Sequence, residues 1–127
     1  MKYSNGVLLI FWICLVACTN ISKDLLEIDL ESWKQDKYGC KDYRISKEEL
    51  ITNNKDNLIS LSEKEISELL GLPETTELIN RSEKYYNYSL AGSKHCDSSR
   101  NSVHKYLRIR FNSLGYAKEV LILSDKL

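Results

Sequence analysis

The densest group of side chains able to bind a metal or attack a substrate comprises His95, Cys96, Asp97 and His104, with Cys40 far upstream. Structural zinc sites usually have Cys-x-x-Cys or His-x-x-x-His spacing, and an adjacent His and Cys fit poorly around one tetrahedral ion. A nucleophilic Cys96 with a histidine base is also disfavoured, because neighbouring side chains of an extended segment point to opposite sides. We therefore expect no metal and no catalytic site here, and we interpret both histidines as loop residues.

The N-terminal residues have the pattern of a secretory signal peptide. Lys2 supplies positive charge, residues 7–16 are apolar without interruption, and the small Ala17 precedes Cys18. The apolar run is shorter than the roughly 20 residues that a transmembrane helix needs. The alternative is an N-terminal core helix, which predicts a polar face that this run lacks. We expect residues 1–17 to be removed on export.

The four residues Leu15-Val16-Ala17-Cys18 resemble the bacterial lipobox. This resemblance implies that a lipoprotein signal peptidase cuts before Cys18, whose thiol carries the lipid. Two or three acyl chains hold a protein stably on a bilayer, whereas one chain holds it only marginally. We therefore expect an anchored protein of the bacterial cell envelope with no cofactor apart from its lipid. Thr19 follows the cysteine in place of an aspartate, which in enterobacterial systems favours the outer membrane.

Two of the four cysteines are then accounted for, since Cys14 leaves with the signal peptide and Cys18 is lipidated. Exported proteins mature in an oxidising compartment, where an even number of remaining cysteines indicates a disulfide. We expect Cys40 and Cys96 to be joined. The alternative is a pair of buried free thiols.

The composition describes one small domain with balanced charge. The chain has 18 basic and 18 acidic residues, and loss of Lys2 leaves 17 against 18. Without a basic surplus, the chain has no electrostatic basis for binding nucleic acid. We interpret residues 18–28 as a tether and residues 29–127 as a single domain. The sequence contains no paired carboxylates, nucleophile elbow or phosphate loop, which predicts a protein that is not an enzyme.

A short helix is predicted around Trp33, in the segment DLESWKQDKYGC. Leu30, Trp33 and Lys37 fall on one helical face. Gly39 directly precedes Cys40 and is a typical residue for a helix end. The helix should therefore end at Gly39.

Two further helices share one start signal, in the segments ISKEEL (45–50) and LSEKEI (61–66). Each has a serine followed three residues later by a glutamate, between two apolar residues. This is the pattern of a capping box with a hydrophobic staple, in which the serine is the N-cap. The first helix should end near Asn53. The second should end at Gly71 in a left-handed conformation, with Leu72 folding back on the helix.

Beyond these helices the apolar residues alternate with a period of two, which indicates strands. The alternating sets are Tyr86, Tyr88 and Leu90; Leu107, Ile109 and Phe111; and residues of KEVLILS (118–124), with a short edge strand expected at 75–80. Gly115 should close a hairpin between the last two strands, and Cys96 should pin the long loop from Ala91 to Val103. Helices followed by antiparallel strands predict an α+β fold, with two to three helices packed on a three- to four-stranded antiparallel sheet.

The strand alternation also predicts a binding face. If Leu107 and Ile109 face the helices, the residues between them face away, together with residues of the preceding strand. The exposed candidates for binding a protein partner are Tyr85, Tyr106, Arg108 and Arg110. Tyrosine and arginine are enriched at protein interfaces. They are also common on the solvated face of an ordinary antiparallel sheet, which is the alternative interpretation.

Residues 61–123 resemble the BamE/SmpA family of outer-membrane assembly lipoproteins. The resemblance rests on LSEKEISELLGLP, YYNYSL and LRIRFNSLGYAKEV, which match a helix ending in Leu-Gly-x-Pro, an aromatic strand and a strand-turn-strand with Phe-Asn-x-x-Gly. The segment before residue 58 is similar to uncharacterised lipoproteins of Bacteroidetes. The resemblance implies two helices on an antiparallel sheet and a non-catalytic binding or scaffold role, accessory to outer-membrane protein assembly. The alternative is an inhibitor or immunity-type lipoprotein that binds a secreted enzyme, because one small fold can serve unrelated functions.

Overall fold

The computed structural model describes residues 27–97 and 103–125. Within these residues, four helices pack against a four-stranded antiparallel sheet, which confirms the predicted α+β fold. The predicted signal peptide, Cys18 and the predicted tether up to residue 26 lie outside the described residues. In the described part of the chain, no helix has the length and apolar character needed to span a membrane.

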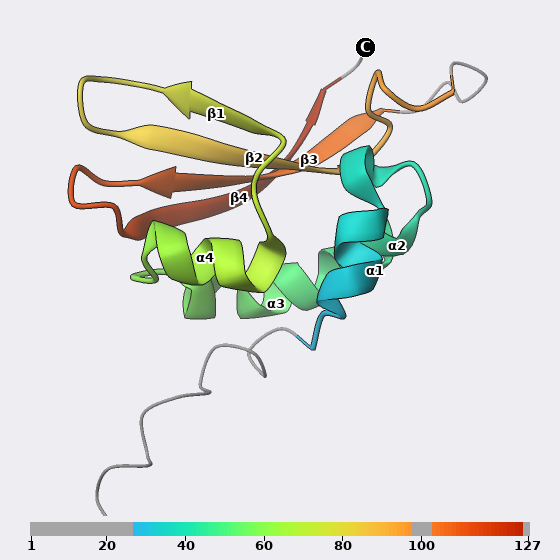
Figure 1. Ribbon diagram of the computed structural model, residues 1–127, viewed down its shortest axis with the longest axis horizontal. Helices are drawn as coiled ribbons and strands as arrows, with labels where there is room; N and C mark the ends of the chain where they lie inside the picture. Colours follow the sequence, from blue (N-terminus) through green and yellow to red (C-terminus); the bar gives the residue numbers. More distant parts are fainter. Residues whose placement is uncertain (1–26, 98–102, 126–127) are drawn as a thin grey trace, which may run out of the picture.

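The sheet is a meander in which strands adjacent in sequence are paired (Figure 1). Its strands are β1 Thr75–Leu78, β2 Lys84–Ala91, β3 His104–Phe111 and β4 Ala117–Asp125. All three pairings are antiparallel, so β1 and β4 form the two edges. The short edge strand predicted at 75–80 is therefore present.

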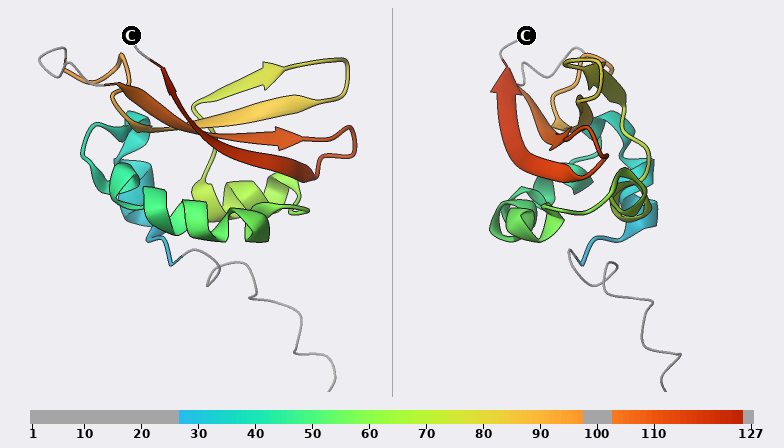
Figure 2. Two further views of the ribbon diagram at one scale, coloured as in Figure 1. Left: turned by 180° about the vertical axis from the view of Figure 1, so that it is seen from behind. Right: turned by 90° about the vertical axis from the view of Figure 1, so that its left-hand side faces the viewer.

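The helical layer covers one face of this sheet (Figure 2). Its elements are α1 Leu30–Gln35, the 3-10 turn η1 Lys37–Gly39, α2 Tyr43–Ser46, α3 Glu48–Leu58 and α4 Glu63–Leu70. The core lies between this layer and the sheet, and its largest side chains, Trp33, Tyr88 and Phe111, are 0% exposed. Ile28, at the end of the predicted tether, packs against this core.

Helix α4 begins and ends at signals contained in its own sequence. The Glu65 amide donates to Ser62 Oγ at 3.3 Å, and the Ser62 amide donates to the Glu65 carboxylate at 2.7 Å, so the capping box is confirmed. Gly71 ends the helix with a φ of 74°, which favours glycine. The predicted return of Leu72 onto the helix is wrong. The ψ of −173° at Gly71 directs the chain away from the helix and leaves Leu72 83% exposed.

The same start signal is wrong for helix α3. Ser46 is the last residue of α2, and its hydroxyl donates to the Tyr43 carbonyl at 2.6 Å instead of capping the next helix. Helix α3 then continues past its predicted end to Leu58. It accommodates Asn54 because the side-chain amide donates to the Leu50 carbonyl of the preceding turn at 2.8 Å.

The first helix ends earlier than predicted. Helix α1 stops at Gln35, and η1 carries the chain on to Gly39. Gly39 has a φ of +68°, and a Cβ there would lie 2.4 Å from the carbonyl carbon of Leu90 in β2. No side chain fits at that distance. A glycine is therefore required for the close approach of this turn to the sheet.

Candidate binding surface

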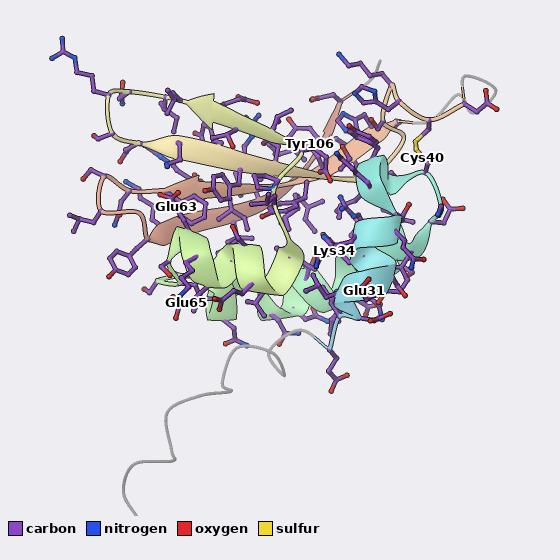
Figure 3. All side chains as sticks on the ribbon, viewed as in Figure 1. Glu31, Lys34, Cys40, Glu63, Glu65 and Tyr106 are labelled. Carbon is purple, nitrogen blue, oxygen red and sulfur yellow. A yellow bond between two sulfur atoms is a disulfide. The ribbon has the colours of Figure 1, made fainter. Side chains whose placement is uncertain are left out.

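The predicted disulfide joins Cys40 to Cys96, whose Cα atoms are 5.3 Å apart. It ties the end of η1 to the loop that follows β2, at the end of the sheet where Tyr106 lies (Figure 3). Both thiols are used in this bond, so neither is available as a nucleophile or a metal ligand. The bond also holds together Tyr38 and His95, which lie close to the two cysteines in sequence.

The face of the sheet opposite the helices carries all four predicted binding residues. In the β2–β3 ladder, Tyr85 is paired with Arg110. Arg108 and Tyr106 follow on the same side of β3, paired with residues of β2. We call the surface formed by the side chains of Tyr85, Asn87, Ser89, Tyr106, Arg108 and Arg110 the open face.

Arg108 is the centre of the open face. Its guanidinium carbon lies 4.7 Å from the ring centre of Tyr85 and 5.3 Å from that of Tyr106. The same group donates to Asn87 Oδ1 at 2.8 Å and to Glu77 Oε1 at 2.9 Å. Cation–π contacts and hydrogen bonds therefore fix the side chain in place before any partner binds.

Arg110 is held in a second network beside the first. It donates to Glu83 Oε2 at 2.6 Å, and Lys118 lies 3.5 Å from the other oxygen of the same carboxylate. The hydrogen bond with Arg110 lowers the pKa of Glu83, and it raises the pKa of Arg110. Because both arginines of the open face have internal carboxylate partners, the surface is not a free cationic patch.

A cleft of about 380 Å³ lies at the disulfide end of the open face. Its lining includes Tyr38 with residues 93–95, and His104, Tyr106 and Asp125 of β3 and β4. Residues of β1 and β2 also line the cleft. This volume falls at the lower end of the range of roughly 300–1,000 Å³ that is typical of small-molecule sites.

Two aromatic pairs line the cleft, and sequence reasoning missed both. The rings of Tyr38 and His95 have centres 4.3 Å apart, and those of His104 and Tyr106 are stacked at 5.1 Å. His104 is the first residue of β3, so its interpretation as a loop residue is wrong, whereas His95 does lie in a turn. His104 lies two residues before Tyr106 in β3, so strand alternation places both side chains on the same face and could have predicted this pair. The Tyr38–His95 pair has no such signal, because a disulfide between distant segments creates it.

Two ionisable groups of the cleft, His104 and Tyr106, have pKa values shifted in the direction that favours their neutral forms. Burial lowers the pKa of His104, against the opposing effect of the Asp125 and Glu74 carboxylates. The Nε2 atom of His104 lies 3.3 Å from Ser89 Oγ. Burial raises the pKa of Tyr106, and a hydrogen bond to Asp125 raises it further. Both rings are therefore uncharged at neutral pH and are suited to stacking.

A buried ion pair lies next to the cleft, and one of its members, Glu74, lines the cleft. Arg44 Nη1 lies 2.6 Å from Glu74 Oε1, and the two side chains are 3% and 5% exposed. Arg44 also donates to the carbonyls of Trp33 at 2.9 Å and Ser89 at 3.1 Å. The other Glu74 oxygen accepts the Ser89 amide at 2.8 Å. This network joins α1, α2 and β2. It fixes the backbone of Ser89, whose side chain contacts His104.

The side chains of the open face and the cleft favour non-covalent binding of a partner. The open face and cleft present aromatic rings, hydroxyls and an amide, and the two arginines of the open face are paired with Glu77 and Glu83. Within residues 27–97 and 103–125, no three His, Cys, Asp or Glu side chains lie close enough together to hold a metal ion. The arrangement is suited to stacking and to hydrogen bonding with a bound partner.

No family model, curated protein or solved structure matches this chain. The resemblance to the BamE/SmpA family therefore stays a prediction.

Proposed function

We propose that this chain is a lipid-anchored lipoprotein of the bacterial envelope that binds a protein partner through the open face, without catalysis. The observation that carries the proposal is the position of Arg108 between the rings of Tyr85 and Tyr106, on a sheet face that the helices leave uncovered. Tyrosine and arginine contribute much of the binding energy at protein interfaces. Side chains already held in place lose little entropy when a partner binds.

The lipid anchor is supported by Leu15-Val16-Ala17-Cys18 and by the apolar run before it. The change Cys18→Ser removes the thiol that carries the lipid in this proposal. The variant should fail to incorporate labelled palmitate and should leave the membrane fraction. A variant that still takes up label and sediments with membranes would exclude the proposed anchor.

The binding role is tested by the double change Tyr106→Ala and Arg108→Ala in the full chain. Capture of the partner from solubilised envelopes should fall at least tenfold, because the stacked centre of the open face is removed. The matched control is Tyr116→Ala with Arg81→Ala, which removes the same residue types at exposed positions in the hairpin loops. The control should capture the partner normally. Circular dichroism and an intact disulfide would show that both variants are folded.

The identity of the captured protein separates the two roles expected for such a lipoprotein. Co-purification with barrel-assembly components would support the role accessory to outer-membrane protein assembly. Capture of a single soluble enzyme would contradict that role and support an inhibitor or immunity protein. Full retention of the partner by the Tyr106 and Arg108 variant would place the binding site elsewhere on the molecule.

A further inference from the structure

The two edges of the sheet differ in length and in side-chain character. Strand β1 has four residues, Thr75–Leu78, all of them exposed. Strand β4 has nine, Ala117–Asp125, and its middle is the apolar run Val120 to Leu123. Natural proteins usually protect sheet edges by making them short, charged or covered, because unpaired backbone groups template further pairing. The short β1 follows this rule, whereas β4 does not.

The outer edge of β4 is covered only at its first residue. The Ser60 amide donates to the Ala117 carbonyl at 2.7 Å, and the Ala117 amide donates to the Leu61 carbonyl at 2.8 Å. From Lys118 to Asp125, no backbone group on this outer edge is hydrogen-bonded to another described residue. A stretch of eight residues is therefore open to an additional strand.

Apolar surface flanks this edge on both faces of the sheet. On the open face, Leu121 is 38% exposed. On the helical side, a groove of about 320 Å³ runs between α3 and β4, lined by residues that include Ile51, Val120 and Ile122. A strand added to the edge would cover Leu121 and the groove at once. Burial of this apolar area would stabilise the contact in addition to the backbone hydrogen bonds.

The free edge is complementary to itself. In two antiparallel copies of β4 related by a two-fold axis normal to the sheet, opposite residues share a face, so the axis lies midway between the two copies of one residue. An axis at Ile122 would place Glu119 opposite Asp125 of the other copy, and like charges directly opposite are destabilising. An axis at Leu121 has no like-charge pair. It pairs Leu121 with itself, Val120 with Ile122, Glu119 with Leu123 and Lys118 with Ser124.

The register with its axis at Leu121 also fits the covered part of the strand. Its seven paired residues run from Lys118 to Ser124 and stop before Ala117, whose outer edge is already bonded to residues 60 and 61. After loss of Lys2 the chain carries 17 basic and 18 acidic residues, so its charge is nearly balanced and little long-range repulsion opposes the approach of two copies. We infer that two copies of this chain pair through the β4 edges, with their Leu121 residues opposite each other across the two-fold axis, to form one continuous sheet.

Cysteine cross-linking in membranes tests both the pairing and its register. Directly opposite residues of antiparallel strands have Cα atoms about 4.5–5.5 Å apart, which is within the range of a disulfide. The full chain with Leu121→Cys should therefore form a covalent dimer under mild oxidation. The matched control Leu123→Cys places the thiol on the same face, but the Cα atoms of residue 123 in the two chains are about 14 Å apart along the strands. That control should remain monomeric on a non-reducing gel.

Sedimentation of the full chain in detergent gives a second, independent measurement. The unmodified chain should sediment as a dimer, and Leu121→Lys, which places a charge on the axis, should sediment as a monomer with an unchanged circular dichroism spectrum. A monomeric unmodified chain at about 100 μM would overturn the inference. Cross-linking through Ile122→Cys instead of Leu121→Cys would overturn the register. A covalent adduct of Leu121→Cys with a different protein would show that the edge serves another partner.

Discussion

The covered and open faces of the sheet come from the same strands, but different interactions hold their side chains. On β3, Leu107, Ile109 and Phe111 are 0% exposed against the helical layer. The alternate residues Tyr106 and Arg108 are held by contacts along the sheet. Burial of apolar area has no directional requirement, whereas stacking and hydrogen bonding depend on particular partners. Substitutions on the covered face should therefore change stability, and those on the open face should change binding.

Phe111→Ala should cause the largest loss of stability of the changes considered below. The ring is fully buried, and its centre lies 4.7 Å from that of Tyr86. Truncation of a buried phenylalanine typically lowers the free energy of unfolding by about 3–5 kcal/mol. The open-face control Tyr106→Leu should cost less than about 1 kcal/mol, because no cavity forms in the core. If urea denaturation gave the same loss in free energy of unfolding for both variants, the covered and open faces would not differ in their contribution to stability.

Arg44→Ala should have the next largest effect, because it leaves a buried carboxylate without its charged partner. Breaking a buried ion pair typically costs about 3 kcal/mol or more, and both side chains here are at most 5% exposed. Adding Glu74→Gln removes the stranded charge while keeping an acceptor for the Ser89 amide. The double variant should therefore be more stable than Arg44→Ala alone in urea denaturation. If the second change recovers nothing, the stability comes from the packing of Arg44 on Trp33, 4.6 Å from its ring centre.

Local patterns in the sequence predicted most of the fold. The alternation along β3 assigned the covered residues correctly, because strand geometry alone places successive side chains on opposite faces. The Ser62 and Glu65 capping box identified the start of α4, since its hydrogen bonds lie within one turn. The same pattern did not cap α3, because Ser46 already completes the one-turn helix α2. A short signal is therefore reliable only where no neighbouring element uses the same residue.

Contacts between distant segments were not predictable in the same way. The four predicted binding residues follow from strand parity, and the open face brings them together as expected. Another part of the cleft lining depends on Tyr38 and His95, which meet because the disulfide fixes their segments. Local sequence predicts Gly39 only as a helix end, whereas its main constraint is the backbone of Leu90. Such contacts arise from tertiary packing and leave no characteristic spacing of residues in the sequence.

The smallest expected effect is a pH dependence that reports on the cleft. Burial holds the pKa of His104 below its ordinary value of 6.5, so the folded protein binds a proton less readily than the unfolded chain. The contribution of the neutral ring to stability is therefore complete above about pH 6.5 and is lost as the pH falls towards the folded pKa. His104→Gln should remove this part of the pH dependence while leaving stability above pH 7 nearly unchanged. Urea denaturation between pH 7.5 and 5.5 measures the difference, and NMR titration of the imidazole gives its pKa directly. An imidazole that titrates above 6.5 would reverse the sign, and would mean that the Asp125 and Glu74 carboxylates outweigh burial in the cleft.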